Sequence, residues 1–143
     1  MKFIHAADLH LDSPLRGLSA YSDAPAEQLR TATRDAFVKL VDIALDEAVD
    51  FMVIAGDIYD RSVPPAEAVT LFDQIVSEIH AAGANLLFIS GNHDGGRRLD
   101  CYSDVLGSAG IYIRARLTED LTPVVLEKNG ERVAFSLVPY LDP

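Results

Sequence analysis

The sequence Phe51-Met52-Val53-Ile54-Ala55-Gly56-Asp57 is a run of five apolar residues that ends abruptly in Gly-Asp. An apolar run of this length, without polar residues at alternate positions, is typical of a strand that is buried on both faces in a parallel sheet. Two other short and mostly apolar segments, residues 2–7 and 86–89, also end on polar residues. The carboxyl ends of these three segments are therefore where we look for a functional site.

Two helices are predicted between the three strands. From about Ala26 to Val49 apolar residues recur every three to four positions, and charged residues take the other faces, which indicates a long amphipathic helix. A second helix is expected to begin at Pro64-Pro65, because proline is tolerated in the first turn, and to end at Gly83. The order strand, helix, strand, helix, strand predicts an α/β fold with right-handed crossovers and a parallel sheet.

The pattern is weaker in the last third of the chain. A short helix is expected around residues 99–106, followed by a brief strand at residues 111–113. Residues 124–127 and 132–138 are expected to form a hairpin, because the intervening Asn129-Gly130 suits a two-residue type I′ turn.

The composition is that of one soluble globular domain, with 143 residues of which 49% are hydrophobic and 24% charged. The chain has no signal-peptide core and no apolar run of roughly 18 residues, so we expect a cytoplasmic protein. Its net charge of −10 argues against a broad nucleic-acid surface, although divalent metals could reverse that sign locally. The lone Cys101 excludes an intrachain disulfide, and we expect it to be a buried structural residue.

Side chains that can bind a metal follow each of the three strands. Asp8 and His10 follow the first strand, Asp57 the second, and Asn92 and His93 the third. In a parallel α/β sheet these positions meet at one rim, where ligands bind. A turn or a capping side chain explains each motif taken alone, so the functional prediction depends on the convergence of all three.

The residue types suit a pair of divalent cations. Carboxylate oxygen, imidazole nitrogen and amide oxygen are ligands for Mn²⁺, Fe²⁺ or Zn²⁺, and two such ions can activate water and stabilise the leaving oxygen of a phosphate ester. One carboxylate must bridge the two ions. We expect Asp57, on the middle segment, to be this bridge, with Asp8 and His10 on one ion and Asn92 on the other.

These motifs resemble those of a known family. Asp8-Leu9-His10, Gly56-Asp57-Ile58-Tyr59-Asp60 and Gly91-Asn92-His93-Asp94 are similar to the motifs of the calcineurin-like metallophosphoesterases. The longer stretches at residues 3–14 and 54–65 resemble bacterial DNA-repair exonucleases of the SbcD type, and the motif at Asp8 is closer to the YhaO-like branch. The resemblance covers nearly the whole chain.

The resemblance implies a fold, a metal centre and residue roles. The fold would be the amino-terminal half of an αββα sandwich, with a largely parallel first sheet and flanking helices. Asp8, His10 and Asp57 would bind the first metal, Asp57 and Asn92 the second, and His93 would act at the scissile phosphate. Mn²⁺ is the expected metal, with Fe²⁺ or Zn²⁺ as alternatives.

Two more carboxylates lie beside these residues in the sequence. We expect Asp94 either to orient His93 or to cap its loop. Asp60 is either a direct participant or a solvated carboxylate in a turn, and the solvated turn is the simpler account.

The sequence departs from the family in one respect. Family members normally supply further histidines later in the chain, including a Gly-His-x-His motif, and this sequence has no histidine after His93. We therefore expect residues 1–143 to be a nuclease domain truncated at its carboxyl end, with an incomplete second metal site and little activity. An exposed edge beside the strand at residues 132–138 is expected to favour self-association.

The resemblance implies a DNA-repair exonuclease or endonuclease whose full-length parent acts on DNA with an SMC-like ATPase subunit of the SbcC type. The alternative within the superfamily is a phosphatase or a cyclic-nucleotide phosphodiesterase. A protein phosphatase should show Gly-Asp-x-Val-Asp-Arg-Gly, whereas Tyr59 and Ser62 replace its Val and final Gly here. A hypothesis from another class is a non-catalytic interaction module that keeps the fold without two complete metal sites.

Overall fold

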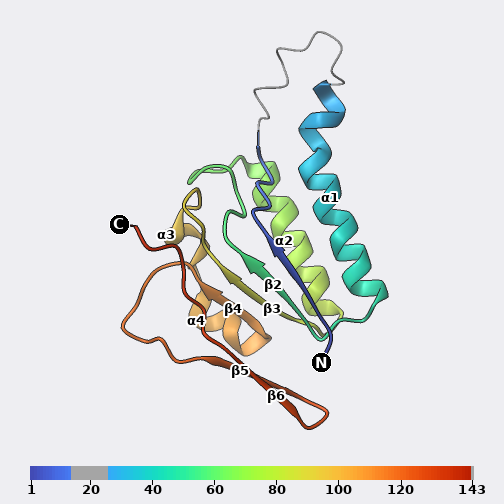
Figure 1. Cartoon of the computed structure of the whole chain (residues 1–143). Coiled ribbons are helices and arrows are strands. Elements are labelled where there is room, and N and C mark those ends of the chain that lie inside the picture. The colour runs from blue at the N-terminus through green and yellow to red at the C-terminus, as the bar shows by residue number, and fades with distance from the viewer. Residues whose placement is uncertain (14–25, 143) are drawn as a thin grey trace.

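The centre of the fold is a four-stranded parallel sheet with the strand order β1-β2-β3-β4 (Figure 1). The computed structural model describes residues 1–13 and 26–142, with only the backbone of residues 26–30. The strands are β1 (Phe3–Ala7), β2 (Phe51–Ala55), β3 (Asn85–Ile89) and β4 (Ile111–Arg114). The predicted parallel α/β sheet is confirmed, and β2 lies between the two other strands that carry candidate ligands at their ends.

The strands pair in a register that aligns their carboxyl ends. Ala7 lies opposite Ala55, Ala55 opposite Ile89, and Ile89 opposite Arg114. All four strands therefore end at one level. The polar segments that follow β1, β2 and β3 begin along the same edge of the sheet.

Helices α1 (Ala26–Asp46) and α2 (Ala66–Ala81) lie together on one face of the sheet (Figure 1). Phe72 of α2 is the centre of this layer: its ring lies 6.4 Å from that of Phe37 in α1 and 5.5 Å from that of Phe88 in β3. Both predicted helices are confirmed. None of the helices in the described ranges is both long and apolar enough to cross a membrane.

The β2 strand is buried on both faces, as its uninterrupted apolar sequence predicted. Met52 and Ile54 belong to the core between the sheet and the helices. Phe51 faces the other way and packs with Leu87 and Leu126 in a second, smaller cluster. Because consecutive side chains of a strand point to opposite faces, each layer takes alternate residues of this one run.

The second cluster is covered by a hairpin of β5 (Val124–Lys128) and β6 (Glu131–Phe135). Asn129 and Gly130 have φ angles of 53° and 81°, the left-handed pair that a type I′ turn requires. Lys128 forms an ion pair with Asp50 and so fixes the turn end of the hairpin to the start of β2. The predicted hairpin is confirmed, although β6 ends at Phe135.

Residues 96–109 do not form the single helix expected at 99–106. Tyr102 has a left-handed φ of 66°, which an α-helix cannot contain. The chain therefore forms two short helices, α3 (Gly96–Leu99) and α4 (Ser103–Leu106), followed by a 3₁₀ turn. Cys101 lies in the turn between α3 and α4 and is exposed, so the expectation of a buried cysteine is wrong.

Candidate metal centre

Asp8, His10 and Asp57 lie together where β1 and β2 end. Each offers one ligand atom, and these atoms lie within 4.8 Å of one another. His10 Nε2 is 3.8 Å from Asp57 Oδ2. The two loops are joined through their backbones, because the His10 amide donates to the Asp57 carbonyl at 2.9 Å and the Leu11 amide donates to the Ile58 carbonyl at 3.0 Å.

All three residues have a left-handed backbone conformation. Their φ angles are 51° at Asp8, 45° at His10 and 39° at Asp57. For residues other than glycine this conformation costs roughly 1–2 kcal/mol each. Residues held in this way cluster at functional sites, where the surrounding structure compensates for the strain. Three strained positions within one cluster of candidate ligands therefore support a functional role for it.

Asp60 orients the imidazole of His10. Its Oδ1 lies 3.0 Å from His10 Nδ1. A carboxylate accepts this bond when Nδ1 carries the hydrogen, and in that neutral tautomer the lone pair lies on Nε2, which faces Asp57. A carboxylate behind a histidine fixes the tautomer that a metal ligand needs. Asp60 is therefore not the solvated turn carboxylate of the simpler account.

His93 lies beside His10, with their ring centroids 5.1 Å apart. Nδ1 of His93 donates to the Asp60 carbonyl at 2.9 Å, which leaves Nε2 free to hold or release a proton. That hydrogen bond raises the pKa of the His93 imidazole, and the charges of nearby carboxylates raise it further. The His93 amide donates to Asp57 Oδ1 at 2.9 Å, so the loop after β3 is fixed against the proposed bridging carboxylate.

Asp94 caps its loop and makes no hydrogen bond to His93 among the described residues. Its carboxylate accepts from the backbone amides of Ile58 at 3.2 Å, Tyr59 at 3.0 Å and Gly91 at 2.9 Å. Of the two expected roles for Asp94, the structure supports capping. The carboxylate thereby joins the loop after β2 to the loop after β3.

Asp12 is a structural residue of the site that sequence reasoning missed. Its side chain is 1% exposed, and its carboxylate accepts from Arg61 Nε and from the Asp60 amide, both at 2.7 Å. It therefore joins the loop after β1 to the loop after β2. The available signal was an aspartate directly after the apolar Leu11, but a single sequence does not distinguish such a buried carboxylate from a solvated one.

Asn92 is placed in the loop after β3, next to His93, and is exposed. Within residues 1–13 and 26–142 its side chain makes no hydrogen bond to the other candidate ligands. Its role as a ligand of the second metal stays a prediction.

The donor set of Asp8, His10 and Asp57 fits a divalent cation. Two carboxylates and an imidazole whose ligand atoms lie this close suit Mn²⁺, Fe²⁺ or Zn²⁺. His10, Asp60 and His93 form a second close group. This group fits a metal less well, because Nδ1 of each histidine already bonds to an oxygen of Asp60.

A parallel sheet with these donors along its carboxyl edge is an α/β domain with a candidate metal centre. A family model described as calcineurin-like phosphoesterase matches residues 1–138, and the chain belongs to this family. The family typically binds divalent metals, in agreement with the cluster of candidate ligands. The resemblance found in the sequence is thus confirmed at the level of the superfamily.

Gly91 leaves room for the Asp57 carboxylate. A Cβ added at Gly91 would lie 2.1 Å from Asp57 Oδ1 and 2.4 Å from the Asp57 amide nitrogen. We expect Gly91→Ala to displace the carboxylate, to lower the free energy of unfolding by about 2 kcal/mol, and to weaken Mn²⁺ binding about tenfold. Urea denaturation and titration calorimetry measure the two effects.

The matched control is Gly107→Ala, because nothing lies within 4 Å of a Cβ added there. This variant should keep both the stability and the metal affinity of the parent. A Gly91→Ala protein that binds Mn²⁺ as tightly as the parent would contradict the assignment of Asp57 as a ligand.

Proposed function

We propose that the chain is a dinuclear-metal phosphodiesterase domain of a DNA-repair exonuclease or endonuclease. The observation that carries the proposal is the cluster of Asp8, His10 and Asp57 at the carboxyl edge of the sheet, with His93 beside it. Hydrolysis of a phosphate ester requires fixed donors for divalent cations and a group that can serve the leaving oxygen. The cluster offers the donors, and His93 is the candidate for the second role.

Asp57 is proposed to serve two metal sites. Its Oδ2 faces His10, and its Oδ1 accepts from the amide of His93, in the loop that also carries Asn92. Asp8, His10 and Asp57 would hold one divalent cation, and Asp57 with Asn92 would hold a second, with Mn²⁺ as the proposed metal. When bound, such cations activate water and neutralise charge on a phosphate ester.

His93 is proposed to act on the leaving oxygen. Its ring is exposed and oriented through Nδ1 by the Asp60 carbonyl, which leaves Nε2 to carry the proton that is transferred. A histidine held in this way beside the metal ligands can protonate an alkoxide as the phosphodiester bond breaks, or stabilise charge on the phosphate.

DNA is the proposed substrate. The support is the sequence resemblance at residues 3–14 and 54–65, together with the exposed Arg97 and Arg98 on α3, just after the His93 loop. Arginines at this position can contact backbone phosphates. The proposed SMC-like ATPase partner of the SbcC type rests on the resemblance alone, and self-association of the chain stays a prediction.

The two metal sites differ in the number of donors that this chain supplies. The first has three, Asp8, His10 and Asp57, whereas the second has Asp57 and Asn92, and the sequence has no histidine after His93. We therefore expect one Mn²⁺ to bind more tightly than the other, and we expect hydrolysis by residues 1–143 to be slow.

Hydrolysis of several phosphoesters tests the proposal. In the presence of Mn²⁺, the chain is incubated with each of four substrates in separate reactions: end-labelled DNA, bis(p-nitrophenyl) phosphate, p-nitrophenyl phosphate and a cyclic nucleotide. Parallel reactions with EDTA are the control. A nuclease cleaves DNA and the diester faster than the monoester. Faster cleavage of the monoester or of the cyclic nucleotide would favour the alternative activities of the superfamily. Mn²⁺ binding without cleavage of any substrate would favour the non-catalytic module.

A further inference from the structure

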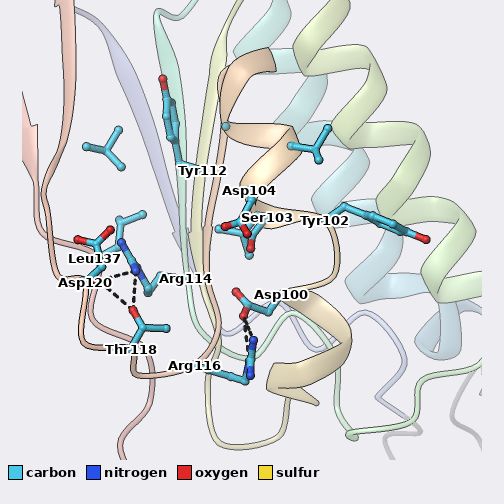
Figure 2. A pocket seen from close by; sticks show the side chains of 14 residues that line it. Asp100, Tyr102, Ser103, Asp104, Tyr112, Arg114, Arg116, Thr118, Asp120 and Leu137 are labelled. Atoms are coloured by element: carbon cyan, nitrogen blue, oxygen red, sulfur yellow. Dashed lines mark hydrogen bonds and ion pairs between the residues drawn. The ribbon is translucent and has the colours of Figure 1, made fainter.

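A groove with a volume of about 590 Å³ runs along the outer edge of β4 (Figure 2). Three consecutive residues of β4, Tyr112, Ile113 and Arg114, line it. Residues of α4 form one wall, and residues of the segment 118–124 with Leu137 form the other. We call this cavity the β4 groove.

The strand beside this groove has an unpaired edge. In the part of the chain that the structure describes, β4 is the last strand of its sheet and pairs only with β3. The Ser90 amide donates to the carbonyl of Arg114, so Arg114 points its backbone groups toward β3. Alternate residues of a parallel ladder point the opposite way. The amide and carbonyl of Ile113 therefore face outward, where another extended chain can pair with them.

The recess around this edge favours one kind of occupant. A second folded copy of the chain would have to bring its own helices and hairpin between the residues that line the two sides of the groove. An extended peptide has no such layers. A single peptide strand therefore fits a recessed edge better than a folded domain does.

The two walls of the groove differ in chemistry. The wall on the hairpin side contributes the apolar side chains of Val124 and Leu137, which pack with Tyr112 of β4 against the second cluster, beside the polar Thr118 and Asp120. The wall on the α4 side carries Asp104, which is exposed and has no ion-pair partner among the described residues. Because alternate side chains of a strand point to opposite sides, the matching peptide has apolar residues at every second position and basic residues between them.

The arginines of the groove do not cancel this negative charge. Arg116 binds Asp100 through Nε and Nη2 at 2.9 and 2.7 Å. Arg114 is held by the Thr118 hydroxyl and by the carbonyl of Asp120. With the aspartates at positions 100, 104 and 120 against these two arginines, the lining keeps an excess of negative charge.

We propose that the β4 groove binds an extended segment of a partner protein, in which apolar residues alternate with Lys or Arg, and that this segment adds to the sheet beside β4. Backbone pairing with Ile113 supplies affinity, the apolar side chains of Val124, Leu137 and Tyr112 contact every second residue of the peptide, and Asp104 contacts a basic side chain. The surface is distinct from the metal centre and does not require bound metal.

The test uses a fluorescein-labelled peptide of alternating Val and Lys, with fluorescence polarisation at about 0.15 M salt, where exposed charges are partly screened. We expect saturable binding to the whole chain, unchanged by EDTA. Asp104→Asn should weaken it about threefold, the usual effect of one exposed ion pair. Asp42→Asn on α1 is the matched control, since Asp42 is also exposed and unpaired among the described residues. Hydrogen exchange of the Ile113 amide should slow on binding.

Several outcomes would overturn the proposal. Absence of binding is one, and equal binding of a peptide that has the same composition but all its Val residues in one block is another. Equal weakening by Asp104→Asn and Asp42→Asn would mean general attraction to an acidic chain. Unchanged exchange at Ile113 would place the peptide elsewhere. Slower exchange at Ile113 with rising protein concentration and no peptide would make a second copy of the chain the occupant.

Discussion

Asp57→Asn should raise the dissociation constant for Mn²⁺ roughly 100-fold or more, because loss of a residue that only supports a ligand already costs 10–100-fold. The substitution keeps the size of the side chain. It removes the negative charge and replaces one of the two carboxylate oxygens. Of these, Oδ2 faces His10 and Oδ1 accepts from the His93 amide. Titration calorimetry with Mn²⁺ measures the change, and Asp42→Asn provides the same chemical substitution at an exposed position on α1.

Stability measurements separate this loss from unfolding. Without metal, the carboxylates of Asp8 and Asp57 lie close together and repel each other. Asp57→Asn should therefore not lower the thermal midpoint in EDTA. Added Mn²⁺ should raise the midpoint of the parent, because a ligand that binds only the folded state stabilises it, and should leave the variant almost unchanged. A variant that keeps the metal-induced shift would remove Asp57 from the metal centre.

His93→Gln should lower kcat for hydrolysis of a DNA phosphodiester about 100-fold while the Mn²⁺ affinity stays the same. Glutamine is polar but cannot transfer a proton near neutral pH, and His93 is proposed to act on the leaving oxygen. The loss should be smaller with bis(p-nitrophenyl) phosphate, because its nitrophenolate leaving group needs no proton. His80→Gln is the control, since His80 is exposed and forms a hydrogen bond with the Ala109 carbonyl at the far end of α2.

The two substrates distinguish the proposed roles of His93. Equal losses on DNA and on the nitrophenyl diester would indicate that His93 stabilises charge on the phosphate and does not protonate the leaving group. A parallel loss of Mn²⁺ affinity would make His93 a ligand. Unchanged turnover of both substrates would exclude it from the reaction.

The sheet could be predicted from sequence because its strands carry the information locally. The run from Phe51 to Ala55 is apolar on both faces, and a helical pattern follows it. A helix between two strands is the usual crossover that joins parallel neighbours. Once the strands are parallel, their polar ends must lie on one side. The meeting of Asp8, His10 and Asp57 follows from this topology, and the structure shows it.

The rest of the site could not be predicted because it depends on hydrogen bonds between loops that are distant in sequence. An aspartate in a loop looks the same in the sequence whether its carboxylate accepts hydrogen bonds from water or from a backbone amide. Asp12, Asp60 and Asp94 are therefore assigned only when their partners are seen. The left-handed φ angles at the three candidate ligands cannot be recognised in the sequence either. The same holds for Tyr102, whose left-handed φ angle splits the expected helix.

The aligned ends of β1, β2 and β3 restrict where the length of this chain can vary. Deleting one residue within β2 would draw Asp57 back by about 3.3 Å relative to Asp8 and would reverse which side chains face the helices. Insertions in the segments at residues 47–50 and 82–84, at the opposite ends of the strands, would leave the pairing of Ala7, Ala55 and Ile89 in place. Changes in length are therefore less disruptive in these two connections than within the strands that carry the candidate ligands at their ends.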